Sequence, residues 1–164
     1  YKHFYTIHRV WFFKLKEYIM ETLKVKIKKL NENAVIPTYS KDGDAGMDLV
    51  ATSEYYDDDG NIVYGTGLSF EIPKGYVGLL FPRSSNAKKD LLLSNSVGVL
   101  DSGYRGEVMF KFKFSNCDYS ENTYEIGDKV GQIIILPYPQ IEFEEAEELS
   151  ETERGNGGYG STGN

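Results

Sequence analysis

Apolar and polar residues alternate with a period of two along much of this chain. Leu23, Val25 and Ile27 are separated by lysines, and the alternation recurs over 68–72 and 108–114. A side chain on the same face at every second residue is typical of a half-buried β-strand. Short apolar runs predict further strands at Tyr76–Phe81, Leu91–Leu93 and Ile133–Leu136.

Turn-forming residues separate these predicted strands. Asp, Asn, Gly, Ser or Pro residues cluster at 57–61, 73–75, 102–103 and 127–128, where they favour tight turns. Many short strands at spacings of about 8–12 residues predict an all-β fold, either a distorted jelly roll or a β-sandwich. No long segment has the 3.6-residue period of an amphipathic helix, and we expect one short helix at Ser84–Asp90.

The chain divides into three regions. Residues 1–20 carry four bases, one acid and several aromatic side chains. We interpret them as an extension upstream of the natural start, and a basic amphipathic helix at a membrane or partner surface is the alternative. Residues 21–140 form the predicted β domain. Residues 141–164 join a run of seven glutamates to a glycine-rich end, which predicts an extended arm and a closing tail.

Composition narrows the class of protein. The chain has 164 residues and a formal net charge of −7, which suits one domain with a real core and argues against nucleic-acid or membrane partners. The single cysteine, Cys117, excludes a disulfide framework and a cysteine-rich zinc site. His3 and His8 lie at the start of the chain, so histidine chemistry is excluded from the domain. With no apolar run of about 18–20 residues, we expect a cytoplasmic protein.

Two local features could bind ions. Arg83, Arg105 and Arg154 all lie in glycine- or serine-rich turns, whereas the predicted strands use lysine. Arginine is the better bidentate partner for phosphate, so this partition indicates an anion site, with salt bridges at turns as the alternative. The DDDGN sequence at 57–61 resembles part of a calcium loop but lacks the carboxylate needed at its end, so a hairpin turn is favoured.

Five turn-rich segments occur in order along the chain. Together they resemble the five motifs of the trimeric dUTPase family, and the resemblance covers roughly residues 23–164. The segments are Asp44–Ala51 (DAGMDLVA), Pro82–Lys89 (PRSSNAKK), Asn95–Val108 (NSVGVLDSGYRGEV), Gly127–Pro137 (GDKVGQIIILP) and Arg154–Gly163 (RGNGGYGSTG).

The resemblance implies an activity and an assembly. The family hydrolyses dUTP to dUMP and pyrophosphate with Mg²⁺, which lowers dUTP and supplies the precursor of dTTP. Its jelly-roll subunits form a homotrimer with exchanged C-terminal arms, and each active site is shared between subunits. Mg²⁺ is held by substrate phosphates and water, without direct protein ligands, which suits a chain that has no cluster of metal ligands.

The resemblance also assigns the chemical step. Asp101 matches the family's catalytic carboxylate, which orients and deprotonates the attacking water, a task that in-line attack on a phosphoryl group demands. Arg154 matches the tail arginine that reaches the γ-phosphate. Asp48 matches a first-motif aspartate that is structural or lies in the outer shell of the metal site.

Recognition of base and sugar is implied for the third segment. Tyr104 matches the aromatic residue that packs on the deoxyribose and leaves no room for a 2′-hydroxyl. Asn95 matches an amide near the uracil, and the hairpin backbone reads the uracil edge while excluding other bases. The remaining expected contacts are Gly98, Val99, Leu100 and Met109, and core packing is the alternative for Met109.

Phosphate binding is implied for the second and fourth segments and the tail. Arg83, Ser84 and Ser85 match the second motif, where a helix start would direct its free N–H groups at phosphates. Ser85 stands where the family usually has Gly. Gln132 matches a polar phosphate contact. In the tail, Tyr159 replaces the usual Phe that stacks on uracil, and the expected phosphate wrap is Gly160, Ser161 and Thr162.

Two other functions stay open at this point. A dCTP deaminase of the same superfamily is the nearest rival, although the third segment and the stacking tail favour dUTP hydrolysis. A regulatory protein that uses nucleotide occupancy as a switch for a protein partner is the second alternative.

Overall fold

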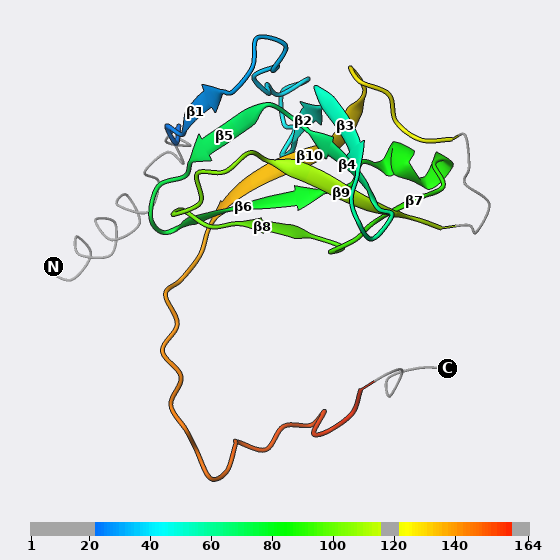
Figure 1. Ribbon diagram of the computed structural model, residues 1–164. Coiled ribbons are helices and arrows are strands. Elements are labelled where there is room, and N and C mark those ends of the chain that lie inside the picture. The colour runs from blue at the N-terminus through cyan, green and yellow to red at the C-terminus, as the bar shows by residue number, and fades with distance from the viewer. Residues whose placement is uncertain (1–21, 116–121, 159–164) are drawn as a thin grey trace, which may run out of the picture.

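The computed structural model of the chain describes residues 22–115 and 122–158 (Figure 1). Within them the chain forms ten strands and one short 3-10 helix. The expected extension over residues 1–20, Cys117 and the end of the tail lie outside the described residues. The elements are β1 (Lys26–Lys29), β2 (Met47–Val50), β3 (Ser53–Tyr56), β4 (Ile62–Gly65), β5 (Leu68–Glu71), β6 (Tyr76–Phe81), η1 (Ser84–Lys88), β7 (Leu91–Leu93), β8 (Gly98–Leu100), β9 (Met109–Phe114) and β10 (Lys129–Pro137).

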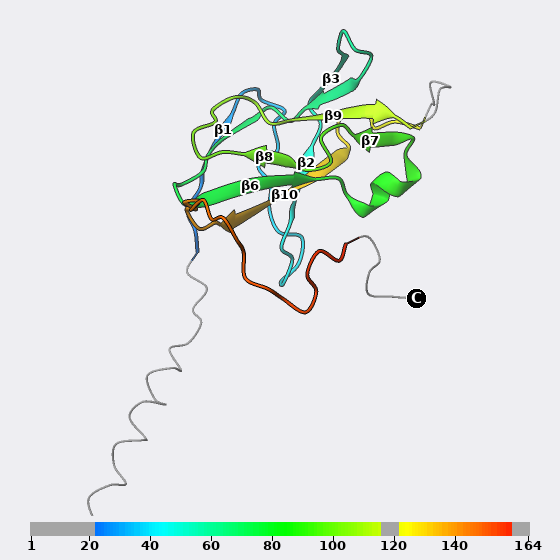
Figure 2. The same cartoon turned by 90° about the horizontal axis from the view of Figure 1, so that it is seen from below.

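The strands form three antiparallel sheets. One four-stranded sheet has the order β2-β10-β6-β8, a second has the order β3-β4-β9-β7, and β1 pairs with β5 alone. Neighbours in a sheet are mostly distant in sequence, which is typical of jelly-roll connections. Figure 1 and Figure 2, which are views at right angles, show that these sheets lie together in one body. The predicted all-β jelly-roll class is confirmed.

The core is built from the inward faces of the alternating strands. Phe110 and Phe112 of β9 are fully buried, whereas the intervening Lys111 is exposed. Tyr64 packs edge-on against Phe112 and Tyr124. Its hydroxyl donates a hydrogen bond of 2.9 Å to the carbonyl oxygen of Tyr124, as a buried phenol requires. Burial raises the pKa of Tyr64 to about 12.

Local predictions hold with small changes. Leu23, Val25 and Ile27 are half-buried between exposed lysines, although the strand itself begins only at Lys26. The expected short helix is the 3-10 helix η1, which ends at Lys88, two residues earlier than predicted.

The DDDGN segment is the hairpin turn between β3 and β4. The Asp57 carboxylate accepts hydrogen bonds from the backbone N–H groups of Asp59 and Asn61. Lys111 lies 2.6 Å from the same carboxylate, and the hydrogen bond from Lys111 lowers the pKa of Asp57. The Asp57 carboxylate, which a calcium loop would need as a ligand, is therefore already bonded to donors of the protein itself.

Beyond β10 the described chain is an extended arm. Residues 138–158 contain no helix or strand, and they run away from the body (Figure 1). Phe143 is 93% exposed and Leu149 is 88% exposed. Within the described part of the chain, no helix has the length and apolar character to span a bilayer.

Candidate active site

The first and second motif segments meet through an ion pair. Arg83 directly follows β6 and Pro82, and its Nε donates to Asp48 Oδ1 of β2 over 2.7 Å. The Arg83 Nη1 group lies 3.3 Å from Ser85 Oγ. Since Nε is fixed by Asp48, the guanidinium plane has a defined direction while most of its N–H donors remain for a ligand.

A lysine from the fourth motif segment completes this cluster. Lys129 Nζ lies 2.9 Å from Asp48 Oδ2. Strand β10 has an irregularity here, because Lys129 pairs with Val50 and Gly131 pairs with Leu49. The extra residue of such a bulge shifts the alternation, so Lys129 and Gln132 face the same side of the sheet. Two cations and one carboxylate give the cluster a formal charge of +1.

Gln132 holds the loop that carries Arg83. Its Nε2 donates to the carbonyl oxygen of Pro82 over 3.1 Å, and it pairs in register with both Asp48 and Phe81. A Cβ added to Gly46 would lie 2.6 Å from Gln132 Oε1, so this glycine leaves room for the amide. Gln132 thus lies beside the Arg83 cluster, and its contact with phosphate stays a prediction.

The serines of the second motif lie on η1. Ser84 is exposed and Ser85 is half-buried. Asn86 anchors the helix, since its amide donates to Leu91 O over 2.8 Å and its Oδ1 accepts from Tyr124 Oη over 3.0 Å. Because η1 has only five residues, its dipole is weak, and Arg83 supplies the main positive charge.

The third segment begins with a connection, residues 94–97, that leads from β7 to β8. These two strands lie in different sheets, so the expected hairpin is not formed between them. Asn95 is exposed and Val99 is 62% exposed, whereas Gly98 and Leu100 are buried. A Cβ on Gly98 would lie 3.0 Å from the Leu80 Cβ, so the backbone of β8 packs closely on β6. The expected base-reading surface is therefore open to solvent on a firm support.

The loop after β8 carries Asp101 and Tyr104. Asp101 is exposed, and its carbonyl oxygen accepts from the Tyr104 N–H over 3.0 Å. The Tyr104 hydroxyl donates to Glu107 O over 3.1 Å. A Cβ on Gly106 would lie 2.3 Å from the same hydroxyl oxygen. The ring thus rests on Gly106 with 44% of Tyr104 exposed.

Met109 faces solvent at the start of β9. It is 41% exposed, and the Tyr55 hydroxyl lies 3.8 Å from its sulfur. This position excludes the core-packing alternative and leaves Met109 available for a ligand.

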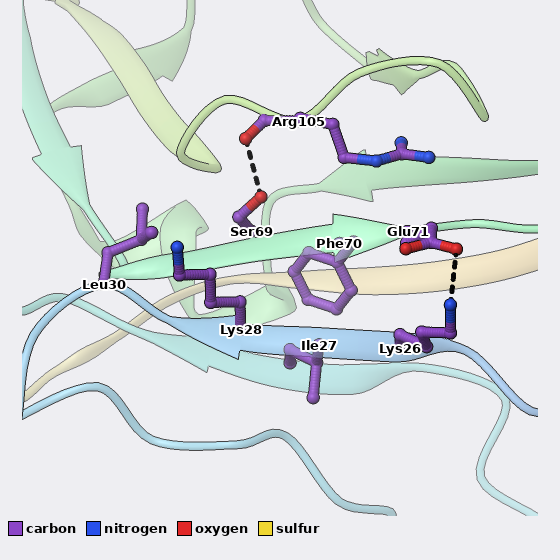
Figure 3. A pocket seen from close by; sticks show the side chains of 8 residues that line it. All are labelled: Lys26, Ile27, Lys28, Leu30, Ser69, Phe70, Glu71 and Arg105. Carbon is purple, nitrogen blue, oxygen red and sulfur yellow. Dashed lines mark hydrogen bonds and ion pairs between the residues drawn. The ribbon is translucent and has the colours of Figure 1, made fainter.

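Arg105 braces this loop from behind. Its guanidinium Nη1 donates to the carbonyl oxygens of Ser102 and Tyr104 over 2.7 and 2.8 Å. Its own carbonyl oxygen accepts from Ser69 Oγ over 2.7 Å. Arg105 and Ser69 border a hollow of about 430 Å³ beside β1 and β5 (Figure 3). Of the three turn arginines, Arg105 is thus occupied with backbone oxygens of its own loop.

The Arg83 cluster and the loop that carries Asp101 and Tyr104 lie at opposite ends of β6. Arg83 follows the end of β6, whereas Leu100, just before Asp101, pairs with Gly78 near its beginning. Arg83 is the fifth residue after Gly78, which is about 16 Å along an extended chain. One chain therefore does not bring Asp101 to the Arg83 cluster.

The tail is separate from both groups. Arg154 is exposed, and its Nε donates to Gly157 O within the arm over 2.9 Å. The last predicted tail contacts lie outside the described residues: Tyr159, Gly160, Ser161 and Thr162.

A direct protein-bound metal is not suggested by the described residues. They contain no group of three Asp, Glu, His or Cys side chains that could hold an ion. Both oxygens of Asp48 meet cations, so Asp48 fits an outer position better than direct ligation. A divalent ion carried on phosphate oxygens is compatible with this set of side chains.

Sequence reasoning missed Lys129 and Gly106. Lys129 lies three residues before Gln132, and simple alternation places two such residues on opposite faces. The bulge that unites them has no clear sequence signal. Gly106 stands beside Tyr104 and Arg105 in the third motif, but its close approach to the ring is visible only in three dimensions.

Comparison with known proteins identifies the family. The family model described as dUTPase matches residues 32–163. A deoxyuridine 5′-triphosphate nucleotidohydrolase of Nautilia profundicola is 43% identical over 145 residues, which are 86% of this chain and 99% of the relative. Another, of a Hydrogenobaculum species, is 38% identical over 147 residues, with 86% and 99% coverage.

Solved structures agree with this result. The dUTPase of Staphylococcus bacteriophage 80alpha with dUPNHPP has a TM-score of 0.74 and 28% identity, covering 87% of this chain and 99% of the phage chain. A dUTPase from phage phi11 of S. aureus, described with a structural Mg(II) ion, has a TM-score of 0.65 and 26% identity, with 77% and 98% coverage. The chain belongs to the dUTPase family.

Proposed function

We propose that this protein hydrolyses dUTP to dUMP and pyrophosphate. The observation that carries the proposal is the positive cluster of Asp48, Arg83 and Lys129, which three separate family motifs build on one sheet. Such a cluster suits a triphosphate, and relatives that cover nearly their whole length are nucleotidohydrolases of dUTP. In the cell the reaction lowers dUTP and supplies dUMP, and we place it in the cytoplasm.

Asp101 is the proposed general base. Its carboxylate is exposed on a loop that Arg105 braces, so a water molecule can reach it. The carboxylate accepts the proton of this water as the oxygen attacks a phosphorus atom in line with the pyrophosphate leaving group.

The phosphates bind to the other group of residues. Arg83 donates the N–H groups that Asp48 leaves open, and Ser84, Ser85 and Gln132 add polar contacts. Where a glycine would let the backbone approach a phosphate closely, the Ser85 hydroxyl makes the contact instead. Mg²⁺ on the phosphate oxygens offsets their charge and aligns them, when bound.

Strand β8 and the loop after it select base and sugar. The backbone of Gly98, Val99 and Leu100 reads the uracil edge, with Asn95 and Met109 beside it. The Tyr104 ring closes the space that a 2′-hydroxyl would need, so UTP is rejected. A nucleotide that fits poorly and also leaves polar groups of the site unpaired is rejected more strongly than one that only fits poorly.

The complete site requires three copies of the chain. Asp101 and Arg83 lie at opposite ends of β6, so a second copy must supply one of them. The arm projects from the body with Phe143 and Leu149 exposed, which suits its transfer to another copy. There Arg154 reaches the γ-phosphate, Tyr159 stacks on the base, and the wrap is made by Gly160, Ser161 and Thr162. In this proposal residues 21–140 are the β domain and 141–164 are the exchanged arm and tail.

A substrate panel tests the activity. Pyrophosphate release with Mg²⁺ is measured for dUTP, dTTP, dCTP and UTP, and ammonia is measured for dCTP. We expect pyrophosphate from dUTP at a rate at least about 100-fold above the others. Ammonia from dCTP, with no pyrophosphate from dUTP, would instead assign a deaminase.

A truncation before Arg154 tests the assembly. Light scattering should give three chains per particle for the full and the shortened chain, whereas turnover falls about 100-fold because one anion-binding group and the stacking ring are removed. An active monomer, or an unchanged rate after truncation, would contradict the shared site.

A regulatory role is a second candidate. The phage 80alpha dUTPases are described as controlling the transfer of virulence genes by a G protein-like mechanism. Their similarity to this chain favours a test of partner binding with and without a non-hydrolysed dUTP analogue. Nucleotide-dependent binding of a defined partner would support the role.

A further inference from the structure

Lys129 is a residue of the phosphate cluster to which no role has been assigned above. Its Nζ lies 2.9 Å from Asp48 Oδ2, while Arg83 Nε lies 2.7 Å from Asp48 Oδ1. The side chain of Asp48 is 21% exposed, that of Arg83 is 32% and that of Lys129 is 48%. One carboxylate therefore joins two cations at the edge of solvent, where an anionic ligand can reach them.

The position of Lys129 is fixed by packing. The bulge in β10 directs Lys129 to the face that holds Asp48 and Gln132. Gly131 lies within the bulge, and a Cβ on it would be 2.1 Å from a ring carbon of the fully buried Phe110. Because the core fixes the bulge, the lysine is not free to leave the cluster by a shift of its strand.

Two consequences for Arg83 follow from this contact. With Lys129 on Oδ2, Asp48 presents Oδ1 to Arg83 Nε, while Arg83 Nη1 donates to Ser85 Oγ, so three of the five guanidinium N–H groups remain for a ligand. The lysine charge also matters. An Asp48–Arg83 pair alone would be formally neutral, whereas the three groups together carry +1, which attracts a polyanion more strongly.

We infer that Lys129 is a positioning residue for dUTP binding, which acts by orienting Asp48 and, through it, the phosphate-binding arginine Arg83. The inference rests on the proposed hydrolysis of dUTP. The ligand group that Arg83 binds is the triphosphate of dUTP. Because Arg83 contacts phosphate both before and during the reaction, Lys129 affects the binding of the substrate and of the transition state equally.

Substitution with a matched control tests the role. Lys129→Met removes the charge and retains the length of the side chain. Lys111→Met is the control, because Lys111 forms a Lys–Asp pair of similar exposure, 50% and 15%, on the other four-stranded sheet. We expect Lys129→Met to raise KM for dUTP about tenfold with kcat within about twofold, as loss of uniform binding predicts. Lys129→Arg restores KM to within about threefold.

Two results of this comparison would overturn the inference. One is a KM for Lys129→Met equal to that of the unchanged protein. The other is an equal rise in KM for Lys111→Met, which would indicate a general effect of surface charge.

A double-mutant cycle tests the route through Asp48. If Lys129 acts by way of Asp48, then Lys129→Met adds less than about twofold to the KM of Asp48→Asn, because the two substitutions break one network. Full additivity would overturn the positioning role, because it would mean that Lys129 meets the phosphates directly.

A readout without catalysis separates this inference from the proposed function. The chain has only four arginines, so their Nε–H signals can be assigned by nuclear magnetic resonance. In the nucleotide-free protein, Lys129→Met should speed solvent exchange of the Arg83 Nε–H at least about fivefold, whereas Lys111→Met should not. Unchanged exchange would contradict the inference. Failure of the unchanged protein to release pyrophosphate from dUTP would contradict only the function.

Discussion

The candidate site residues at the two ends of strand β6 differ in how firmly the fold holds them. At its end, Arg83 is held by Asp48, the adjacent loop by Gln132, and the whole cluster by the core-packed bulge in β10. At its beginning, Asp101 and the edge of the Tyr104 ring are exposed on a loop, where the Arg105 and Tyr104 side chains donate hydrogen bonds to backbone carbonyl oxygens.

This difference separates two requirements of the site. In the proposed mechanism, phosphate binding uses the charges that one folded chain fixes at the end of β6. Base selection and water activation use β8 and the loop after it, whose ligand-facing sides are open and which a second chain is proposed to complete. Overpacking at the braced end should therefore cost more stability than the same change at the open end.

Asp101→Asn should have the largest effect. The amide cannot accept the proton of the attacking water, so we expect kcat to fall about 1,000-fold. The free energy of unfolding and the affinity for a non-hydrolysed dUTP analogue should stay close to their original values, because the side chain is exposed. Turnover within tenfold of the original would show that Asp101 is not the base.

Gly131→Ala tests the braced end. The new Cβ would lie 2.1 Å from a ring carbon of Phe110, and such overpacking costs about 2–3 kcal/mol of unfolding free energy. Urea unfolding measures this loss. Gly103→Ala at the open end is the matched control, since its Cβ meets nothing within 4 Å. Equal stability of the two variants would refute the difference between the ends.

Gly106→Ala tests the seat of the Tyr104 ring. The methyl group would lie 2.5 Å from the ring carbon Cζ, so the ring must shift from its place on the sugar side. We expect the preference for dUTP over UTP, measured as a ratio of kcat/KM values, to fall about tenfold. An unchanged ratio would mean that another group excludes the ribose.

Ser96→Gly should have the smallest effect. Ser96 has a φ of 60° in the connection from β7 to β8, a left-handed conformation that costs a residue with a Cβ about 1 kcal/mol. Glycine relieves this strain, so thermal unfolding should show a gain of about 0.5–1 kcal/mol. A loss of stability would indicate that the serine side chain makes a compensating contact.

The strands were the predictable part of the fold. Alternation at Phe110 and Phe112 and the apolar run of β6 reflect burial directly, so a period of two identifies them. The bulge in β10 was not predictable, because an extra residue in one strand depends on the register of its partner. That bulge decides the face on which Lys129 lies.

The sequence predicts which residues belong to the candidate site, but it does not predict how they are arranged in space. The motif segments identify Arg83, Asp101 and Gln132 because each belongs to a short, ordered run of residue types. Their distribution over the two ends of β6 follows from pairing between distant strands. The sequence of one chain also does not state how many copies a complete site needs.

Complementation between two inactive variants tests the shared site most directly. Chains with Asp101→Asn and chains with Arg83→Ala are produced together with different tags, and mixed particles are purified. If each site takes Asp101 from one chain and Arg83 from another, every mixed trimer keeps one of its three sites intact, so turnover of dUTP should recover to about a third of the original. Activity no higher than the mean of the two parent variants would contradict the shared site.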